Sequence, residues 1–344
     1  MDLLARILDP TKPPLVVAEM SGNHGGDLNK ALNLVLEAHR AGADAIKLQT
    51  YTPETITVAG TGQRFQLQSG LWKGQKLSDL YQRAMTPWEW HPLIAEEAAK
   101  WGLICFSSPF DESAVGFLED SITPPLYKVA SFELNHFPML RRIGCTEKPV
   151  LASIGVSKEG EIRHAIDVLT GSGCPQVILL HCLSEYPAKP SDFCLQKMPG
   201  IYRKYGVPYG LSDHSLGYLI AVAATALGAR VIEKHFCLDR EDYTSVDAAF
   251  SMTPAEFSEM VKAVKMTHQA ISGEQVPQAP VSYKRSILVS SPIASGDLLG
   301  VHNIRIARPG DGLCPSRWDE VLGTLATKNM DIGHPLSDED FRSP

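Results

Sequence analysis

The sequence predicts a (β/α)8 barrel, also called a TIM barrel, in which eight parallel strands alternate with eight helices. Apolar, β-branched runs alternate with longer stretches of helical period over roughly 270 residues. Almost every run ends in a side chain that can bind an anion, a metal or a proton, as expected where barrel strands end at one mouth. No GxGxxG motif follows the first run, which disfavours the alternative of a doubly wound open sheet.

The first half of the chain supplies four of the predicted strands. A helix at 28–41 follows the first strand, and Gly42 is suited to its C-terminal cap. The polar, glycine-containing stretch 51–86 is too long for a simple connection and is typical of a functional lid. The predicted strands are 14–19, 44–49, 102–108 and 126–131, and the further helices are 87–100 and 111–118.

The second half repeats this alternation and then changes character after Gly273. We predict a catalytic barrel over 1–273, a linker at 274–283, and a small, mostly β module in the rest of 274–344, with a short helix at 317–322. The remaining barrel strands are 149–153, 176–182, 208–213 and 230–236, and the helices are 138–143, 158–169, 192–205, 216–229 and 254–271.

Composition excludes several classes of protein. The formal net charge of −7 argues against a nucleic-acid groove or an anionic membrane surface as the partner. No apolar run approaches about 18 uncharged residues, and 1–14 lacks the hydrophobic core of a secretory signal. Seven cysteines without CxxC spacing suit core positions in a reducing compartment. We therefore expect a cytoplasmic protein.

The strand ends carry the chemistry. A lysine inside an apolar strand, as at Lys47 and Lys128, must pair with an anion or lose its charge, so the two lysines and nearby hydroxyls predict a cradle for a phosphate and a carboxylate. Glu19 is the candidate acid or base. The strand-end groups are Glu19, Lys47, Gln49, Ser107, Ser108, Lys128, Ser131, Ser153, His181, Ser212, Asp213, His214, Glu233, Lys234 and His235.

Two histidines end neighbouring predicted strands. His214 follows 208–213 and His235 lies in 230–236, and the helix between them makes the two strands parallel neighbours. Both imidazoles would then lie at the same edge, close enough to share one metal ion. A lone histidine is more often structural, but the pair predicts a metal site.

Collinear motifs are spread over the whole chain: AEMSGNHGGDLNKAL, AGADAIKLQTYTPETIT, FSSPFDESAVGFLE, YKVASFE, LLHCLSEYP, GLSDHSLG, VIEKHF and DAAFSM. Together they resemble the sialic acid synthase family, and most closely its pseudaminic acid synthase branch. The module within 274–344 resembles the SAF (antifreeze-like) domain, which has a β-clip fold. The resemblance implies a transferase that condenses phosphoenolpyruvate with the open chain of an amino sugar and water, giving a nine-carbon 2-keto acid and phosphate.

The resemblance also implies roles for individual residues. His214 and His235 would hold a divalent ion, Mn2+ or else Mg2+ or Co2+, and Glu19 would be the acid/base group. Arg308 of RPGDG would reach the sugar from the second subunit of a domain-swapped homodimer, although the residues alone leave open whether it acts in cis or in trans, or is a solvated turn. Phosphoenolpyruvate would contact Lys47, Gln49, Ser108, Lys128, Ser131, Ser153 and Ser212, and the sugar would contact Ser184, Tyr186 and Asp247.

Departures from the family pattern leave the sugar open. Gly25 stands where the family has asparagine, Ile154 and Val156 change its STGM motif, and Ser184 replaces an asparagine of sialic acid synthases. The sugar implied by the pseudaminic branch is 2,4-diacetamido-2,4,6-trideoxy-L-altrose. The alternative is an N-acetylneuraminate or legionaminate synthase, which would perform the same chemistry on another sugar. A non-catalytic carbohydrate-binding protein is a third possibility, which the metal pair and the buried acid together disfavour.

Overall fold

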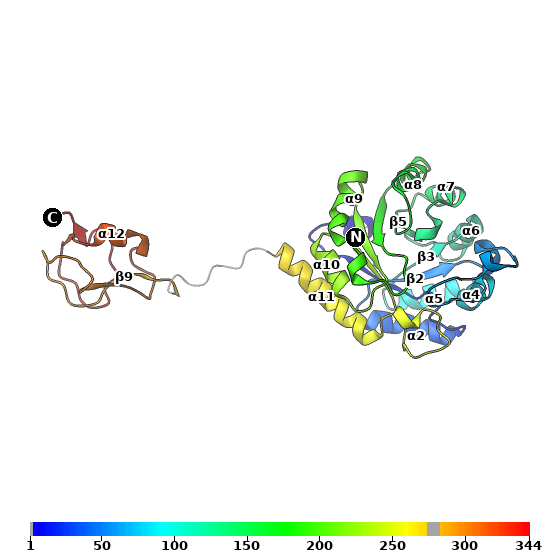
Figure 1. The fold of residues 1–344 in the computed structure, drawn as a ribbon, viewed down its shortest axis with the longest axis horizontal. Helices are drawn as coiled ribbons and strands as arrows, with labels where there is room; N and C mark the ends of the chain where they lie inside the picture. The colour runs from blue at the N-terminus through cyan, green and yellow to red at the C-terminus, as the bar shows by residue number, and fades with distance from the viewer. Residues whose placement is uncertain (1–2, 274–282) are drawn as a thin grey trace. The chain divides into compact units, whose positions relative to one another are not determined.

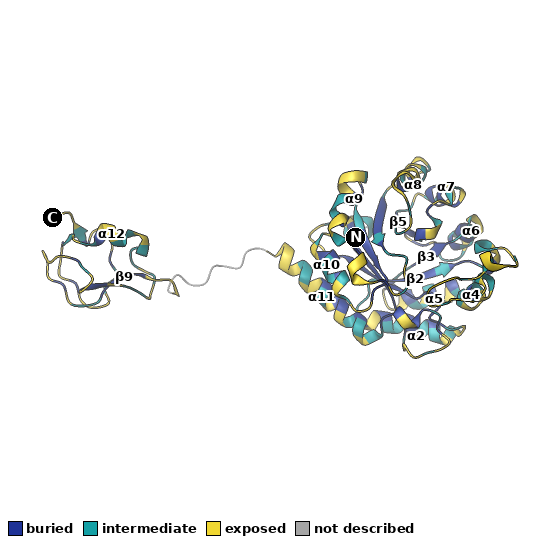
Figure 2. Ribbon diagram, viewed as in Figure 1, coloured by how far each residue is buried: buried dark blue, intermediate teal, exposed yellow. Residues whose placement is uncertain are grey.

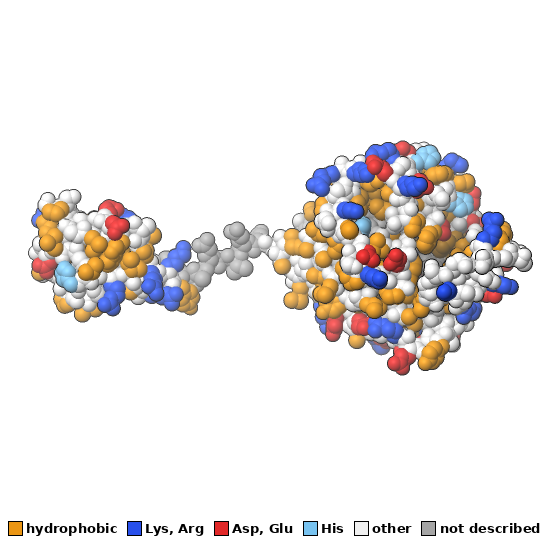
Figure 3. Space-filling model, viewed as in Figure 1, with side chains coloured by type: hydrophobic (Ala, Val, Ile, Leu, Met, Phe, Trp, Pro, Cys, Tyr) orange, Lys and Arg blue, Asp and Glu red, His pale blue; other side chains and the backbone are white. Residues whose placement is uncertain are grey.

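The computed structural model describes residues 3–273 and 283–344, which fall in two compact units, Met1–Gly273 and Glu274–Pro344 (Figure 1). The predicted linker at 274–283 lies, except for Tyr283, outside the described residues. Among the described residues, no helix has both the length and the apolarity needed to span a bilayer. On the viewed face of the first unit, acidic and basic side chains are interspersed (Figure 3).

The first unit is a closed barrel of eight parallel strands in chain order, which confirms the predicted (β/α)8 fold. β1 pairs with both β2 and β8, so the sheet has no free edge. The strands are β1 (Leu15–Glu19), β2 (Ala45–Thr50), β3 (Ile104–Pro109), β4 (Tyr127–Val129), β5 (Val150–Ser153), β6 (Val177–Cys182), β7 (Tyr209–Asp213) and β8 (Val231–His235).

Helices surround these strands in the ribbon of Figure 1. The Asp27 side chain caps α2 (Leu28–Arg40), the helix after β1, by accepting a hydrogen bond from the backbone N of Asn29. Gly42 has a φ of 88° just beyond the C-terminal end of this helix, as predicted. The helices are α2 (Leu28–Arg40), α5 (Trp90–Lys100), α6 (Glu112–Ser121), α7 (Phe137–Gly144), α8 (Glu159–Gly171), α9 (Met198–Tyr205), α10 (Leu219–Ala226) and α11 (Pro254–Ser272).

Three segments differ from the prediction. The stretch 51–86, here the lid segment, is not all loop: it contains α3 (Pro53–Ile56), η1 (Gln63–Phe65) and the amphipathic α4 (Leu77–Ala84). The helix expected at 192–205 begins only at Met198, because Pro199 fits the first turn of a helix but not its interior. The short helix α1 (Leu3–Leu8) was not predicted; Ile7 on it is buried.

The barrel interior is built in layers along the strands. Toward their amino ends, an apolar cluster includes Val17, Ala45, Leu126 and Val231, together with Ile7 of α1. The strands and the inner faces of the helices are the buried parts in Figure 2. Because successive strand side chains alternate between faces, the residues two positions further along point inward in the next layer. That layer contains the polar strand ends.

The second unit is mostly β, as predicted, and has an apolar core of its own that includes Ile287, Val289 and Ile304. Its two small antiparallel sheets pair β9 (Ser286–Val289) with β10 (Ile304–Ala307) and β11 (Leu325–Ala326) with β12 (Phe341–Arg342). The short helix α12 (Trp318–Val321) lies within the predicted 317–322.

Candidate active site

Alternation along the strands divides the predicted strand-end residues between two faces. Ser212 and Glu233 are register partners on the inner face of β7 and β8. Asp213 and Lys234, the next pair in register, therefore face the helices, and their side chains form an ion pair of 2.7 Å with each other. The expectation that these two residues also line the mouth is wrong.

Ser107 and His181 face outward for the same reason. Ser107 Oγ lies 2.7 Å from Thr50 Oγ1, which also contacts His91 of α5. His181 donates from Nε2 to the carbonyl of Phe193, which precedes α9. The pleat thus explains why only part of the polar strand ends converges on the mouth.

Four inward-facing charges, Glu19, Lys47, Lys128 and Glu233, form what we call the charged layer. Lys47 Nζ lies 2.7 Å from Glu19 Oε2 and 3.7 Å from Glu233 Oε1, and Lys128 Nζ lies 2.8 Å from Glu233 Oε1. All four residues are at most 4% exposed. The lysines are therefore paired by the protein's own carboxylates, whereas the sequence analysis assigned them only a substrate anion as partner.

Glu233 was predicted only as one of the strand-end groups, without a role in the site. It also accepts a hydrogen bond of 3.0 Å from Ser212 Oγ, so it joins three predicted site residues at one carboxylate. A signal was present: Glu233 precedes His235 by two residues, so both must lie on one face of a strand.

The two carboxyl groups of the charged layer have opposite electrostatic environments. Burial raises the pKa of Glu19 to about 6, although Lys47 beside it acts in the other direction. Burial would also raise the pKa of Glu233, but Lys128 and Lys47 outweigh it and lower that pKa. Titratable neighbours whose pKa values are pushed apart are typical of acid/base sites. Glu19 is the group able to exchange a proton near neutral pH, and Glu233 is the permanent anion.

A second buried carboxyl group, Glu133, was also missed. It follows Ser131 in the turn after β4, and its buried Oε2 atom has no hydrogen-bond partner among the described residues. Burial raises its pKa to about 7, despite Lys128 and Lys47 nearby. Nothing in the local pattern distinguishes it from an exposed turn glutamate, since β4 ends two residues before Ser131 and the strand alternation no longer applies.

A chain of hydrogen bonds links Glu19 to the loop after β8. Gln49 Nε2 donates to Glu19 Oε1 at 2.8 Å and to Ser21 Oγ at 3.0 Å, and Ser21 Oγ in turn donates to Asp247 Oδ2. Ser21 has a left-handed φ of 46°, which is uncommon outside glycine. Gln49 and Asp247, both predicted site residues, are thus brought to Glu19.

His214 and His235 lie together, with ring centroids 5.5 Å apart. His214 Nδ1 donates to the carbonyl of Leu183 at 2.6 Å, which leaves the Nε2 lone pair free. His235 Nδ1 is buried 3.9 Å from Asp247 Oδ2 and has no hydrogen-bond partner in the described part of the chain. Burial lowers the pKa of His214 to about 4 and also lowers that of His235, so both rings are neutral at pH 7.

Two neutral imidazoles with available lone pairs suit a divalent metal ion. The described residues contain no group of three or more His, Cys, Asp and Glu side chains arranged to hold an ion. A bound ion would therefore have two protein ligands here and open positions for water or substrate oxygens.

The predicted hydroxyl groups line the other side of the mouth. Ser108 Oγ accepts from Lys47 at 3.2 Å, and Ser131 Oγ accepts from the backbone of Val156 at 3.0 Å. The Oγ atoms of Ser153 and Ser184 are buried and have no hydrogen-bond partner within residues 3–273 and 283–344. Such unsatisfied buried groups are rare in folded proteins and are a reason to look for a ligand.

Aromatic rings stand beside the two histidines. The ring of Tyr186 lies 4.3 Å from that of His214, and the ring of Phe250 lies 4.9 Å from that of His235. Trp72 of the lid segment contacts both aromatic rings and donates from Nε1 to the carbonyl of Val246 at 3.1 Å. The lid segment therefore reaches the site, as predicted.

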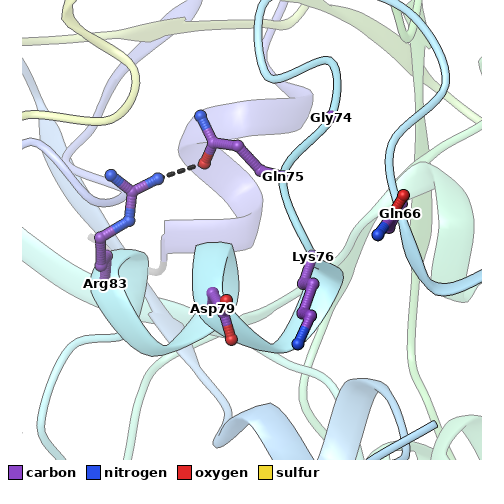
Figure 4. Close-up of a pocket in the computed structure, with 6 residues that line it drawn as sticks. All are labelled: Gln66, Gly74, Gln75, Lys76, Asp79 and Arg83. Atoms are coloured by element: carbon purple, nitrogen blue, oxygen red, sulfur yellow. Dashed lines mark hydrogen bonds between the residues drawn. The ribbon is translucent and has the colours of Figure 1, made fainter. Parts of the chain in front are cut away.

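Two cavities adjoin the lid segment. One of about 370 Å3 lies between it and the loop after β8, and its lining includes Trp72, Arg83, Arg240 and Ala248. The other, of about 450 Å3, is shown in Figure 4, where Arg83 and Gln75 are hydrogen-bonded. Its lining is Gln66, Gly74, Gln75, Lys76, Asp79 and Arg83. Neither cavity is lined by the charged layer or by the two histidines.

Arg308 follows β10 in the second unit and is exposed. It has no ion-pair partner among residues 3–273 and 283–344. Its predicted role at a barrel mouth therefore stays a prediction.

The chain matches known proteins over most of its length. Residues 34–276 match the NeuB family and 284–342 match the SAF domain. A pseudaminic acid synthase of Campylobacter jejuni is 40% identical over 96% of this chain and 97% of its own, and an N,N'-diacetyllegionaminic acid synthase of the same species is 31% identical over 92% and 97%.

A solved structure of a related enzyme has a similar fold. The N-acetylneuraminic acid synthetase of Leptospira borgpetersenii, in complex with citrate, superposes with a TM-score of 0.69 at 31% identity, covering 78% of this chain and 89% of its own. These relatives are synthases of nine-carbon sugar acids by name, which disfavours a non-catalytic carbohydrate-binding protein. The chain belongs to the NeuB family of such synthases, with a SAF domain after its barrel.

Proposed function

We propose that the protein condenses phosphoenolpyruvate with 2,4-diacetamido-2,4,6-trideoxy-L-altrose and water to give pseudaminic acid and phosphate. The observation that carries the proposal is the charged layer, in which two buried lysines and two buried carboxylates lie among inward-facing hydroxyls. The similarity to a pseudaminic acid synthase and to an N,N'-diacetyllegionaminic acid synthase supports the same class of reaction.

The charged layer suits a small substrate with several negative charges. Lys47 and Lys128 would exchange part of their contact with Glu19 and Glu233 for the phosphate and carboxylate of phosphoenolpyruvate. Hydroxyls without partners, as at Ser153 and Ser184, would gain hydrogen bonds at the same time. The other groups proposed to hold this substrate are Gln49, Ser108, Ser131 and Ser212.

The reaction forms a carbon–carbon bond and a bond from C2 of phosphoenolpyruvate to a water oxygen, and it breaks the bond between C2 and the phosphate oxygen. C3 of phosphoenolpyruvate bonds to the aldehyde carbon of the open-chain sugar, and a water oxygen adds at C2. As the 2-keto group forms, phosphate leaves with its bridging oxygen; of the two water protons, one balances the proton taken by the aldehyde oxygen and the other leaves with phosphate. Glu19 is positioned to orient that water or to handle the proton of the aldehyde oxygen, because its raised pKa allows exchange near neutral pH. Gln49 and Lys47 hold its two oxygens in place.

His214 and His235 would hold the divalent ion, proposed as Mn2+ with Mg2+ or Co2+ as alternatives. When bound, such an ion polarises a carbonyl oxygen as a Lewis acid. Tyr186 stacks on His214 and limits the space beside it, and Asp247 lies near His235 with its pKa raised by burial. Both would contact the sugar.

The surroundings of the histidines favour a deoxy sugar. Phe250 beside His235, with Trp72 against it, provides apolar surface, and a 6-hydroxyl buried against these rings would gain no hydrogen bond from them, which is unfavourable. The pseudaminic acid synthase is also more similar to the chain than the legionaminic acid synthase, at 40% against 31% identity.

The test of the sugar is a panel of substrates. With Mn2+ and phosphoenolpyruvate present, phosphate release is expected to be fastest with 2,4-diacetamido-2,4,6-trideoxy-L-altrose, and slower by at least about tenfold with its stereoisomers or with an amino sugar that keeps the 6-hydroxyl, since one misplaced group costs about 1–3 kcal/mol. Phosphate and nine-carbon 2-keto acid should appear in equal amounts. A higher kcat/KM with any other sugar would contradict the proposed specificity.

Replacing Lys128 tests the anion cradle. Lys128→Met is expected to raise the KM for phosphoenolpyruvate and lower turnover, with kcat/KM down about 10- to 150-fold, because a charge-assisted contact of about 1.5–3 kcal/mol is lost. Lys148→Met is the matched control, since Lys148 pairs with Glu119 of α6 on the outside of the barrel. Equal kinetics for the two variants would show that Lys128 does not bind this substrate.

We further propose a cytoplasmic, domain-swapped homodimer in which Arg308 reaches the sugar bound in the partner's barrel. Arg308 after β10 is exposed and has no ion-pair partner within 3–273 and 283–344, which supports this, because such a guanidinium is available to bind a polar ligand. A pseudaminic acid synthase matches the chain over both units, so a barrel and a SAF domain occur together in that relative as well.

A further inference from the structure

We infer that Asp213, Ser215 and Lys234 are positioning residues: they form an outer clamp on the helix-facing side of the barrel wall that sets the relative placement of His214 and His235. The inference rests on the proposed metal role of these two histidines. None of the three clamp residues touches the mouth, so they act through the strands that carry the ligands.

The clamp alternates in sequence with the site. On β7 and the residue after it, Ser212 and His214 face the mouth, and Asp213 between them faces outward. On β8, Glu233 and His235 face the mouth, and Lys234 between them faces outward. Asp213 and Lys234 are register partners, so a tie between their side chains joins the two strands directly behind the histidines.

The contacts of the clamp hold the backbone on both sides of His214. Lys234 Nζ lies 2.7 Å from Asp213 Oδ2 and donates to the backbone carbonyl of Ser215 at 2.6 Å. Asp213 Oδ1 accepts from the backbone N of Ser215 at 2.8 Å and from its Oγ at 2.7 Å. His214 lies between two residues that are both tied to β8, so its backbone has little freedom to move away from His235.

The inner side of the wall completes this restraint. The carbonyl of His214 accepts from Ala188 N at 3.0 Å, and its Nδ1 contacts the carbonyl of Leu183. On the β8 side, the carbonyl of His235 accepts from Met252 N at 2.9 Å. With ring and backbone held, the direction of the available Nε2 of His214 is fixed relative to His235.

Stability alone is a poor reason for this arrangement. Asp213, Ser215 and Lys234 are at most 1% exposed, and a buried ion pair is often no more stabilising than apolar residues of the same volume. The Arg6–Asp44 ion pair, at the amino ends of the strands, is not buried in this way, because its side chains are about a quarter exposed. Buried groups that hold metal ligands in place characteristically change metal affinity about 10- to 100-fold when replaced.

The main test variant removes both charges together, because a single replacement leaves a buried charge without a partner. In the full chain, Asp213→Asn with Lys234→Met keeps an acceptor oxygen near Ser215 and abolishes the tie to β8. Mn2+ binding is measured without substrate, by the electron paramagnetic resonance signal of the free ion. The Kd for Mn2+ is expected to rise about 10- to 100-fold. The absorption spectrum of bound Co2+ should change in shape, since the ligand geometry changes.

Two further variants keep the test decisive. Arg6→Met breaks an ion pair far from the mouth, and it should lower thermal stability while leaving the Kd for Mn2+ within about twofold, because it leaves the ligand geometry intact. Ser215→Ala removes one hydrogen bond and no charge, and should raise the Kd for Mn2+ a few-fold even if the paired variant does not fold. Rescue of Lys234→Ala by a small alkylammonium ion should lower its Kd for Mn2+ again.

The outcomes separate the clamp from the metal proposal. A folded paired variant with the unmodified protein's Kd and Co2+ spectrum would overturn the clamp alone. If the paired variant is unfolded, an unchanged Kd for Ser215→Ala overturns it. If the unmodified protein binds no divalent ion, the metal role of His214 and His235 fails, and the clamp fails with it as a device for that site.

Discussion

Replacing His235 with alanine is expected to lower turnover by about a thousandfold or more while leaving the barrel folded. A metal ligand contributes several kcal/mol to stabilising charge in a transition state, and about 4 kcal/mol corresponds to this factor. His235 Nδ1 has no hydrogen-bond partner among the residues that the structure describes, so the substitution breaks no bond seen at that atom. The fold should persist because the lost ring faces the mouth and the β8 backbone pairs with β1 and β7.

Chelation separates loss of the metal from loss of the fold. Treating the unmodified protein with a chelator should abolish phosphate release, and added Mn2+ should restore it, whereas His235→Ala should show no recovery at the same Mn2+ concentration. His91→Ala is a matched control, because His91 is also a buried imidazole with a lowered pKa but contacts Thr50 on the helix side. The His91→Ala variant should unfold at a lower temperature, and its phosphate release should still depend on Mn2+. Full turnover in the chelated protein would contradict the metal role.

The fold was predictable because the period of the sequence changes wherever the structure does. Apolar runs such as 149–153 and 176–182 are too short for helices, and each is followed by a helical stretch, which leaves parallel pairing as the simple solution. Closure of the sheet follows from the number of strands. The lid segment was located by its length, but its helix α4 was not, because the helix is only eight residues long and lies at the end of a mostly polar stretch.

The site was predictable only in part, because polarity at a strand end does not state which face a side chain takes. Asp213 and His214 are adjacent in sequence, yet Asp213 pairs with Lys234 on the outer face of the wall and His214 faces the mouth. The inward apolar residue two positions earlier gives the phase: Val231 lies in the barrel core, so Glu233 and His235 follow it inward. Glu133 has no such reference, since it lies beyond the end of β4.

Electrostatic roles could not be assigned from sequence for a different reason. Glu19 and Glu233 both end strands, and only the distances to Lys47 and Lys128 separate a carboxyl group with a raised pKa from one with a lowered pKa. The role of Arg308 depends on how subunits combine, which no local pattern encodes.

Mixing two inactive variants is expected to recover activity if Arg308 acts across subunits. Arg308→Ala lacks the arginine and Glu19→Gln lacks the acid/base group, so each homodimer should be nearly inactive. In a mixed dimer, one barrel combines an intact Glu19 with an intact Arg308 from the other chain. Random pairing of equal amounts makes half of the dimers mixed, each with one complete site, so about one quarter of the unmodified activity should return.

In a second mixture, trans action predicts less activity than cis action, the reverse of the first mixture. A nonspecific effect of mixing therefore cannot explain both results. A chain carrying both substitutions, mixed equally with the unmodified chain, leaves about one quarter of the activity if Arg308 acts in trans, because every mixed dimer is then inactive, but about one half if it acts in cis. Dimer formation and exchange are checked by native mass spectrometry on the full chains. Trans action thus predicts about one quarter in both mixtures, and cis action predicts none in the first and one half in the second. Verified mixed dimers that give the second pattern would show that Arg308 serves its own barrel, and full activity of Arg308→Ala alone would show that it serves neither.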